Sequence, residues 1–485
     1  MKRLNSARIP MSQLLSAQLS ANRESKARMQ QQDKLLVVGG GMAAYGLCRE
    51  LARVQLCERY SIRVLGEEPR PAYDRVNISS LFSGQSADEL TLAPVDWYDE
   101  HGIDLRTDSL IRRLYPKQQF VEDEQGRRHH FDRLVLATGS RPWLPPIPGI
   151  ESEGVFVYRT IEDLQSIRSY IEARGAKRSA VIGGGLLGLE AAKVMMDLGL
   201  SVSIVEMAPG LMPRQLDARG ARVLKQRIEA LGVEVHLTRR TSQIERHGDI
   251  LRLSFQQQQG LEVDVLLVAA GIRPRDELGA EAGLQLGQRG GFAVNRFLQT
   301  SVPNIYAIGE CAAFEDYTYG LVAPCYRMAE VLAGRLADQD VEFSRADESA
   351  ELKLLGIPVT ALGKALGNAA GGVVIQNEDE GGYRKLILEQ GRVIGASSVG
   401  ECEDLDMLRL AVNQQKRLWP HQRSRFAKSG RLSPIGESLP VSQWPADATV
   451  CACHGVQRAS LTAAVDSGAD TVEALAEQTL ASTSC

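Results

Sequence analysis

Long apolar runs are missing from this 485-residue sequence. Glycines and charged residues interrupt every apolar stretch before it reaches the roughly 18 residues that a membrane span needs, so no membrane partner is expected. A large excess of either charge is missing too, because 56 Lys and Arg face 60 Asp and Glu, which gives a formal net charge of −4. Bulk electrostatics therefore favours neither nucleic acid nor an anionic membrane. Small molecules and proteins are the expected partners.

Dense cysteine pairing is also absent. Eight cysteines are spread along the chain, which is not the density of a disulfide-rich secreted scaffold and favours a reducing compartment. Residues 1–33 are rich in Gln, Ser, Arg and Lys and lack the apolar segment of a secretory signal. We therefore expect a cytoplasmic protein with a flexible N-terminal extension. The alternatives for this extension are an organelle transit peptide and a misassigned start, with Met11 or Met29 as the first residue.

Two glycine-rich turns dominate what is present. VVGGGMAAYGL begins at Val37 and VIGGGLLGLEAA begins at Val181. Each turn follows an apolar strand and opens a helical pattern, and the next strand ends in an acid, Glu67 in the first case and Glu206 in the second. This order is typical of a unit that binds one dinucleotide. The sequence therefore predicts two dinucleotide sites, and the alternative is two βαβ units without ligands.

The three small residues of each turn have separate tasks. The first allows the tight turn, the second lets the backbone approach a pyrophosphate, and the third keeps the helix close to the sheet, with phosphate charge at the helix N-terminus. In the first turn these residues are Gly39, Gly41 and Ala44, and in the second they are Gly183, Gly185 and Gly188.

Later strand ends support a flavin nucleotide in the first site. ATGSRP ends a strand in small residues, which let the backbone pass close to a cofactor, and YAIGEC ends a strand in a glycine and an acid. A carboxylate there can accept hydrogen bonds from a ribityl hydroxyl while amides of the next helix face the phosphates. In the unit of the second turn, the string VDVLLVAAG ends at Gly271, which is a further cofactor-binding candidate. The candidate cofactor-binding residues are Ala137, Thr138, Gly139, Gly271, Gly309 and Glu310.

Polar residues after the first acid strand add to this site. Glu67 is expected to accept hydrogen bonds from an adenosine ribose, and Glu68, one residue on, is the alternative. Arg75 and Asn77, in the loop YDRVN, are candidates for contacts near the flavin ring. Their alternative interpretation is ordinary loop polarity.

The pattern resembles the two-dinucleotide flavoproteins of the pyridine nucleotide-disulfide oxidoreductase superfamily over about residues 34–335. The resemblance implies an α/β fold in which FAD occupies a discontinuous domain and a nicotinamide dinucleotide occupies a domain inserted within it. The nicotinamide would lie against the flavin ring so that hydride passes directly to it. Glu190, in the string GLE, stands where a glutamate of this superfamily commonly approaches the nicotinamide; a helix-surface charge is the alternative.

Glu206 favours NADH over NADPH as the donor. It follows Gly185 by about 20 residues, near the distance at which an acid accepts hydrogen bonds from both ribose hydroxyls. Its charge would repel a 2′-phosphate, and the string MAPGLM after it contains no arginine that could bind one.

Redox cysteines of the usual kind are missing beside the flavin. A disulfide reductase of this superfamily needs a close cysteine pair on the helix after the first acid strand, and single-cysteine peroxidases and oxidases need one cysteine there. The string YDRVNISSLFSG contains none. The electrons of the flavin must therefore leave by another route.

The C-terminal tail supplies a candidate route. Cys451 and Cys453 form a CXC pair and Cys485 follows a helical stretch, which resembles the small [2Fe-2S] domain of bacterioferritin-associated ferredoxins. Such clusters bind four thiolates, and the tail holds three, so we expect a site completed downstream, or an incomplete or absent one. A buried thiol pair is the alternative. His454 is expected to be a loop residue rather than a ligand.

These units divide the chain. The stiff string PPIPG marks a boundary, and the strand NIYAIGE should rejoin the first sheet after the inserted unit. The expected parts are an FAD domain at 34–148 and 266–345, an NAD domain at 149–265, a small α+β domain at 346–417, a linker at 418–449 and a small helical [2Fe-2S] domain at 450–485.

Several strings resemble NAD(P)H nitrite reductase large subunits and the electron-transfer subunits of assimilatory nitrate reductases: GEEPRPAYDRVNIS, GLLGLEAAK, LMPRQLD, TSVPNIYAIGECA and LKLLGIPV. The resemblance implies that electrons pass from NADH through FAD and a [2Fe-2S] centre to a nitrate- or nitrite-reducing partner. The sirohaem domain of nitrite reductases has no counterpart in this sequence. The alternatives are a ferredoxin or rubredoxin type of reductase and a non-catalytic redox sensor, and a homodimer is also left open.

Overall fold

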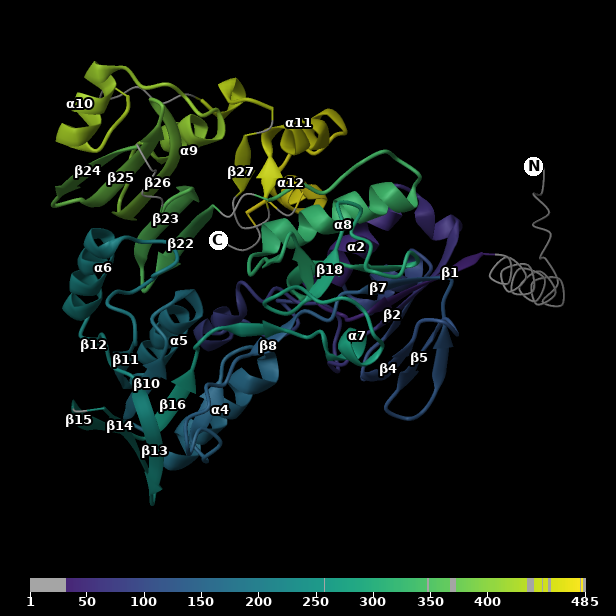
Figure 1. The fold of residues 1–485 in the computed structure, drawn as a ribbon, viewed down its shortest axis with the longest axis horizontal. Helices are drawn as coiled ribbons and strands as arrows, with labels where there is room; N and C mark the ends of the chain where they lie inside the picture. The colour runs from purple at the N-terminus through teal and green to yellow at the C-terminus, as the bar shows by residue number, and fades with distance from the viewer. Residues whose placement is uncertain are drawn as a thin grey trace, which may run out of the picture.

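The computed structural model describes residues 32–256, 258–346, 349–366, 372–433, 440–446, 448–451, 455–479 and 481–482. The chain forms two parallel sheets with helices, an antiparallel sheet and a small C-terminal module, and Figure 1 shows this module between the antiparallel sheet and the first parallel-sheet unit. No helix of the described ranges is long and apolar enough to cross a membrane.

The first unit is built on a parallel sheet in the order β19-β7-β1-β2-β3. Its central strands are almost continuously apolar because helices cover both faces of such a sheet. The strand NIYAIGE rejoins this sheet, as the sequence predicted, since β19 pairs in parallel with β7. The strands are β1 (Asp33–Val38), β2 (Tyr60–Leu65), β3 (Ile103–Arg106), β7 (Arg133–Leu136) and β19 (Ile305–Ala307).

Two long helices pack against one another beside this sheet, α2 (Met42–Arg53) and α8 (Val322–Leu336). They come so close that a Cβ atom on Gly46 would lie 2.6 Å from the ring of Tyr326. Shorter elements surround them: η1 (Leu56–Glu58), η2 (Ile78–Ser83), α3 (Val95–Glu100), β4 (Ile111–Tyr115), β5 (Phe120–Asp123), β6 (Arg128–His130), α7 (Glu277–Glu281), β18 (Phe292–Val294), η3 (Gly309–Cys311), β20 (Ala312–Phe314) and β21 (Tyr317–Thr318).

The second unit repeats the design in the order β12-β11-β10-β16-β9. Its strands are β9 (Val155–Val157), β10 (Arg178–Ile182), β11 (Ser201–Val205), β12 (Glu234–His236) and β16 (Val265–Val268), and its helices are α4 (Ile161–Arg174), α5 (Leu186–Asp197) and α6 (Ala218–Ala230). A meander is attached, made of β13 (Thr241–His247), β14 (Ile250–Phe255) and β15 (Gln258–Val263).

The expected boundary between residues 265 and 266 is wrong. β16 pairs in parallel with both β10 and β9, so residues 266–268 belong to the second sheet. The string VLLV is buried throughout, and a fully apolar strand has the same pattern in either sheet. The chain returns to the first unit along β17 (Ile272–Pro274), which pairs with β8 (Ser140–Pro142).

The third unit is an antiparallel sheet in the order β22-β23-β26-β25-β24. Its elements are β22 (Ala350–Leu354), β23 (Ile357–Gly363), β24 (Val373–Asp379), β25 (Gly382–Glu389), β26 (Arg392–Gly400), α9 (Leu405–Asn413) and α10 (Pro420–Ser429). The expected linker at 418–449 is therefore wrong in its first part, because α10 packs on β24 and buries Phe426 completely. Phe426 is the one buried residue of α10, so the sequence of this helix has the polar composition that is typical of a linker.

Asp217 joins the second and third units. It is the N-cap residue of α6 and accepts a hydrogen bond from the backbone N–H of Gly220 at 2.9 Å. Its carboxylate also accepts a hydrogen bond from the Tyr383 hydroxyl at 2.7 Å and lies 3.0 Å from the Lys385 ammonium, both on β25. Polar contacts of Asp217 with Tyr383 and Lys385 therefore connect the second unit with the third.

The C-terminal module contains η4 (Val441–Gln443), β27 (Thr449–Cys451), β28 (Val456–Gln457), α11 (Arg458–Asp466) and α12 (Val472–Thr479). The two short helices expected in the tail are confirmed and pack against one another. Figure 1 shows the module beside α8. The contact is close, since a Cβ atom on Gly455 would lie 2.9 Å from the Cβ atom of Ala323.

Candidate functional site

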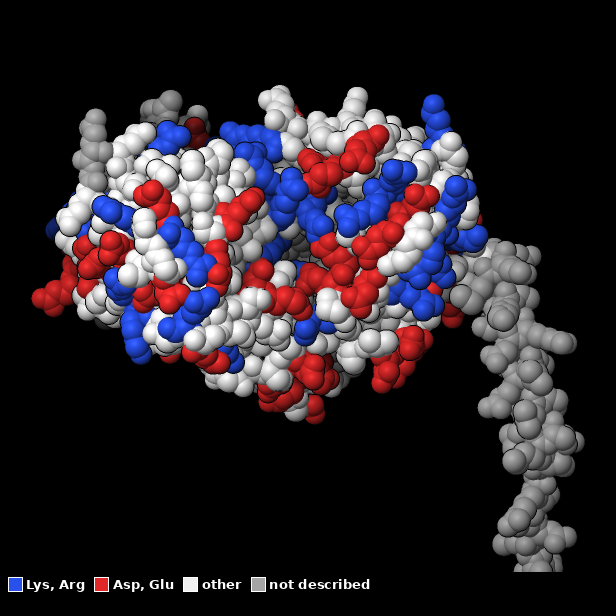
Figure 2. All heavy atoms as spheres, turned by 90° about the horizontal axis from the view of Figure 1, so that it is seen from below, with Lys and Arg blue, Asp and Glu red and all other residues white. Residues whose placement is uncertain are grey.

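One large cleft of about 3070 Å³ is lined by the first and second units and, along one side, by residues of the third unit such as Lys364 and Arg392. Figure 2 shows a face hollowed near its middle, with lysine and arginine side chains gathered around the hollow beside acidic ones. Both glycine turns face this cleft. Thirteen of the residues expected from the sequence line it: Gly39, Gly41, Glu67, Arg75, Ala137, Thr138, Gly139, Gly183, Gly185, Glu190, Glu206, Gly271 and Glu310.

The first glycine of each turn sits where no other residue fits. Gly39 has φ +114° and Gly183 has φ +117°, a region that side chains strongly disfavour. A Cβ atom would lie 2.1 Å from the Ala137 carbonyl oxygen in the first turn and 2.3 Å from the Ala269 carbonyl oxygen in the second. The two turns are thus the same structure used twice.

The second glycine of each turn leaves open space at a helix N-terminus. Gly41 and Gly185 are the N-cap residues of α2 and α5, and neither provides a side-chain cap. A Cβ atom on either would have no neighbour within 4 Å. Free N–H groups and the helix dipole at such an end favour a phosphate, so both turns fit the pyrophosphate of a dinucleotide.

Four of the expected cofactor-binding residues do not line the cleft. Ala44 is buried between helix and sheet, and a Cβ atom on Gly188 would lie 1.9 Å from the Gly183 carbonyl oxygen. A Cβ atom on Gly309 would lie 2.9 Å from the Cβ atom of Ala43. Small residues at these three positions therefore allow close packing behind the cleft. Asn77 caps η2, where its carbonyl accepts a hydrogen bond from the Ser80 N–H at 3.0 Å.

Glu67 and Glu68 have different partners at the adenosine end of the first turn. Glu67 is ion-paired with Arg275, with Nη2 and Oε2 at 2.6 Å. Glu68 accepts a hydrogen bond from the Tyr73 hydroxyl at 2.8 Å and is ion-paired with Arg75. Both oxygens of each carboxylate are therefore engaged by protein groups. The Glu67 side chain is the more exposed of the two, at 35% against 22%.

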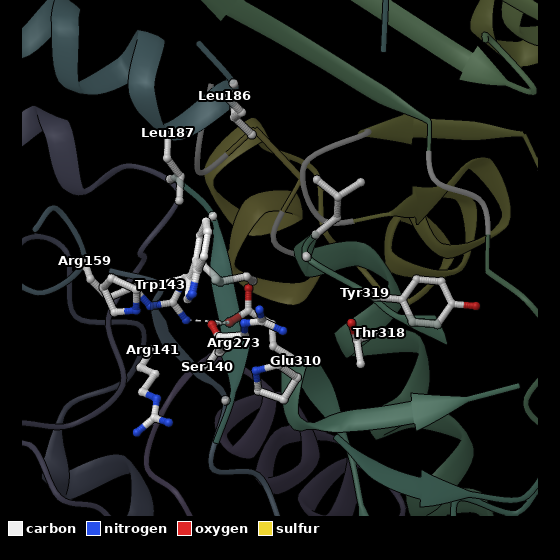
Figure 3. A pocket seen from close by; sticks show the side chains of 18 of the residues that line it. Ser140, Arg141, Trp143, Arg159, Leu186, Leu187, Arg273, Glu310, Thr318 and Tyr319 are labelled. Carbon is white, nitrogen blue, oxygen red and sulfur yellow. Dashed lines mark hydrogen bonds and ion pairs between the residues drawn. The ribbon is translucent and has the colours of Figure 1, made fainter. Parts of the chain in front are cut away.

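Glu310 joins the two units at the centre of the cleft. It accepts a hydrogen bond from the Ser140 hydroxyl at 2.7 Å and is ion-paired with Arg159 at 2.5 Å (Figure 3). The two charged side chains are only 18% and 17% exposed, so the pair is weakly screened by solvent. Arg75 donates a hydrogen bond to the Arg159 carbonyl at 3.2 Å, which places it on the same wall.

Glu190 lies in the first turns of α5 and faces the cleft. Burial raises its pKa from the ordinary 4.5 to about 7. The buried Tyr158 lies near it. A carboxyl group with such a pKa can hold a proton near neutral pH, which suits a contact with an uncharged ligand group.

Glu206 is fixed at the end of β11, beside the second turn. One carboxylate oxygen accepts a hydrogen bond from the Gly184 N–H at 2.6 Å, and the other accepts one from the Ala208 N–H at 2.7 Å. Each oxygen keeps a further lone pair that can accept a hydroxyl proton. The two amide contacts therefore hold the carboxylate in a fixed orientation beside the second turn.

The crossover between the units also lines the cleft. Thr138 donates its hydroxyl proton to the Arg275 carbonyl at 2.6 Å, and the Arg275 N–H donates to the Gly139 carbonyl at 2.9 Å. Trp143 points into the cleft with the guanidinium of Arg273 5.5 Å from its ring centroid (Figure 3). The pairing of β8 with β17 thus brings side chains from both segments that connect the first and second units to one wall of the cleft.

Comparison with known proteins agrees with this geometry. A sequence model of the family described as pyridine nucleotide-disulphide oxidoreductase matches residues 33–329. The chain belongs to this family. Members of this family use FAD and a nicotinamide dinucleotide, and the two turns fit these two ligands.

Relatives of this oxidoreductase include longer proteins. The NADH nitrite reductase large subunit of Escherichia coli (strain K12) is 39% identical over 93% of this chain and 54% of its own length. The assimilatory nitrate reductase electron transfer subunit of Bacillus subtilis (strain 168) is 34% identical over 93% of this chain and 58% of its own. The chain spans about half the length of these relatives. An NAD-dependent persulfide reductase from A. fulgidus has a similar structure, with a TM-score of 0.72, 26% identity and coverage of 79% of this chain and 77% of its own.

The cysteines of this oxidoreductase lie away from the usual redox position. Cys451, on β27, is buried, whereas Cys453, His454 and Cys485 lie outside the described residues. Among the residues that the structure describes, no group of three or more His, Cys, Asp or Glu side chains could hold a metal ion. The expected cluster is therefore carried by the sequence pattern alone.

Sequence reasoning missed several residues of the cleft. Arg159 precedes Thr160, the N-cap of α4, and a basic residue between a strand and a capping box was the available signal. Arg273 lies on β17 and Trp143 directly follows β8, and the sequence pattern does not reveal that these two short strands pair. Arg239 and Arg240 follow β12 and line the cleft near Glu206. No local motif marks these positions.

Proposed function

We propose that this chain is an NADH-dependent FAD reductase that delivers electrons through a C-terminal [2Fe-2S] centre to a nitrate- or nitrite-reducing partner. The observation that carries the proposal is the opening of two equivalent dinucleotide turns, at Gly39 and Gly183, into one cleft. When bound, the flavin accepts the two electrons of a hydride and can release them one at a time.

The residues of the cleft divide the work of binding. The helix N-termini behind Gly41 and Gly185 hold the two pyrophosphates, and Glu206 accepts hydrogen bonds from the ribose hydroxyls of the nicotinamide dinucleotide. Glu310 and its partner Arg159 fix the ribityl end of the flavin at the boundary of the two units. Glu190 holds a proton on its carboxyl group beside the nicotinamide, because its pKa is about 7.

The position of the C-terminal module supports an outward route for electrons. Gly455 packs on Ala323 at the start of α8, and Ala323 also lines the cleft. Cys451, the first residue of the CXC pair, is four residues from this contact along the chain. A short path between a flavin and thiolate-bound iron suits one-electron transfer. The nature of the partner rests on the names of the longer relatives.

Anaerobic reduction of the full chain tests the proposal. The purified protein, reconstituted with FAD, ferrous iron, inorganic sulfide and a small thiol that can occupy the fourth ligand position, should contain both FAD and iron, and NADH should bleach the flavin and produce the electron paramagnetic resonance signal of a reduced [2Fe-2S] centre. In Cys451→Ser the flavin should still bleach while that signal disappears. Wild type that retains FAD but no iron would contradict the cluster route and favour a ferredoxin or rubredoxin type of reductase.

A further inference from the structure

Cationic side chains from three segments of the third unit gather at one of its corners. The loop after α9 runs beside the turn between β25 and β26, because the Leu418 N–H donates a hydrogen bond to the Gly391 carbonyl at 3.0 Å. A Cβ atom on Gly391 would lie 2.9 Å from Nη2 of Arg423, in the first turns of α10, and 3.8 Å from Nε of Arg417, in the loop. Both arginine side chains therefore meet at this turn.

Two more cations and a tryptophan extend the cluster. Arg392 follows the turn and donates a hydrogen bond to the Gln415 carbonyl at 3.2 Å, and Lys416 is the next loop residue and is exposed. The Trp419 side chain is 60% exposed, with the Arg417 guanidinium 5.9 Å from its ring centroid. We call five of these residues the Trp419 patch: Arg392, Lys416, Arg417, Trp419 and Arg423.

The cations of this patch have no paired counter-charge. Four other cations of the third unit form ion pairs with acids: Arg384, Lys385, Arg409 and Arg431. Within the described ranges the four cations of the Trp419 patch form none, and Glu389, the exposed acid at the end of β25, is not paired with them. Lys353 and Lys364 of this unit are also exposed and unpaired there, so the distinctive feature of the patch is the grouping of its charges around a tryptophan.

An exposed tryptophan among arginines is typical of a surface that binds another protein. Tryptophan and arginine are enriched at the centres of protein interfaces, where they supply most of the binding energy. The other three tryptophans, at positions 97, 143 and 444, are all more buried than Trp419. Four grouped positive charges fit an acidic surface, and the formal net charge of −4 for the whole chain favours a protein over a nucleic acid.

The Trp419 patch adjoins both the cleft and the C-terminal module. Arg392 lines the cleft, and so does Gln415, beside Lys416. The helix α9 ends just before Gln415, and its buried Leu410 packs against Trp444 of the C-terminal module. In the view of Figure 1, α9 lies between α10 and this module. A protein bound at the patch would therefore stand beside the module that carries the CXC pair.

We propose that the Trp419 patch is a docking surface for an acidic protein, the electron acceptor of this chain. The inference rests on the proposed function, which requires a protein acceptor that approaches the C-terminal module. The cations pair with carboxylates of the acceptor and attract it over a distance, and the Trp419 ring packs against it at the centre of the contact.

Binding of oxidised flavodoxin, a small acidic protein, to the FAD-loaded full chain tests the inference in the absence of NADH. Cytochrome c, a small basic protein, is the counter-probe. Lys416→Glu combined with Arg417→Glu should weaken flavodoxin binding at low salt by at least about tenfold, and Trp419→Ala should weaken it by about tenfold. The matched control reverses two exposed cations of the first unit, Lys117→Glu with Arg113→Glu, and should leave the affinity within about threefold.

The outcomes separate this inference from the proposed function. Wild type that binds flavodoxin no better than cytochrome c, or patch variants that bind flavodoxin as well as the control variant does, overturn the docking surface. A wild-type dimer that the patch substitutions split, seen by sedimentation, overturns the acidic acceptor in favour of a second copy of this chain. Loss of flavodoxin binding in the patch variants of a monomer supports the proposal. Failure of NADH to bleach the flavin overturns the proposed function and leaves these binding results unchanged, because they use the oxidised protein.

Discussion

Alanine substitutions at Gly183 and Gly185 should have different consequences, although the two residues are two positions apart. At Gly183 a Cβ atom would lie 2.3 Å from the Ala269 carbonyl oxygen, and φ is +117°. At Gly185 φ is −87°, and a Cβ atom would have no neighbour within 4 Å. Alanine is therefore excluded by the protein itself at the first position and only by a bound pyrophosphate at the second.

The structure sets the magnitudes. A residue forced into such a φ region costs about 1–3 kcal/mol, and the backbone at Ala269 must also shift to relieve the contact, so Gly183→Ala should lose at least about 2 kcal/mol of stability. Gly185→Ala reduces the conformational freedom of the unfolded chain, so the free energy of unfolding should be unchanged or higher by about 0.5 kcal/mol. Both should lose NADH binding, because each alters the approach of the backbone to the pyrophosphate.

Thermal unfolding of the FAD-loaded proteins, followed by NADH titration, measures both effects. Gly183→Ala should unfold at a lower temperature than wild type, while Gly185→Ala should not, and both should require much more NADH to bleach the flavin. FAD content should stay unchanged in both, because the first turn is untouched. Equal thermal stability of the two variants, or normal NADH use by Gly185→Ala, would refute the reasoning.

Three further predictions concern charged groups. Burial raises the pKa of Glu190 from 4.5 to about 7, so the folded state binds the proton more tightly than the unfolded state. The protein should therefore lose stability relative to Glu190→Gln as pH rises from about 4.5 to about 7. Unfolding of the two nucleotide-free proteins across this range measures the difference, and parallel pH profiles would contradict it. Arg159→Gln should weaken FAD retention, because it leaves the Glu310 carboxylate, which is only 18% exposed, with the Ser140 hydroxyl as its remaining hydrogen-bond donor among the described residues, and dialysis followed by flavin assay should show faster loss than from Arg141→Gln, whose arginine is 60% exposed. Asp217→Asn should lower the free energy of unfolding by about 2 kcal/mol, because the Lys385 side chain is 3% exposed and loses its counter-charge; chemical denaturation unchanged by the substitution would contradict the polar contact between the units.

The sequence predicted the parts of the site that depend on local pattern. The glycine turns at Gly39 and Gly183 are set by backbone conformation and close contacts with one neighbouring strand, and such constraints leave a fixed spacing in the chain. The strand ends at Gly139, Gly271 and Glu310 were found for the same reason, since each follows an apolar strand directly.

The parts that the sequence left open depend on how distant segments pack. The pair of Glu310 and Arg159 joins positions in two units, and no spacing rule connects them. The boundary expected between residues 265 and 266 cuts through β16, because pairing with β10, not composition, decides where this strand ends. The linker expected at 418–449 includes α10, because this helix buries one side chain, Phe426, and has no apolar face that the sequence could show. Arg239 lies beside Glu206 through a backbone hydrogen bond between two loops, which no spacing in the sequence reveals.

Mixing NADH with the FAD-loaded full chain in the absence of oxygen measures directly whether two dinucleotides meet in one cleft. One equivalent of NADH should bleach one equivalent of flavin, and Gly185→Ala should abolish the bleaching at this stoichiometry while it retains FAD. Flavin that stays oxidised although NADH binds to the protein would show that the two ligands do not meet.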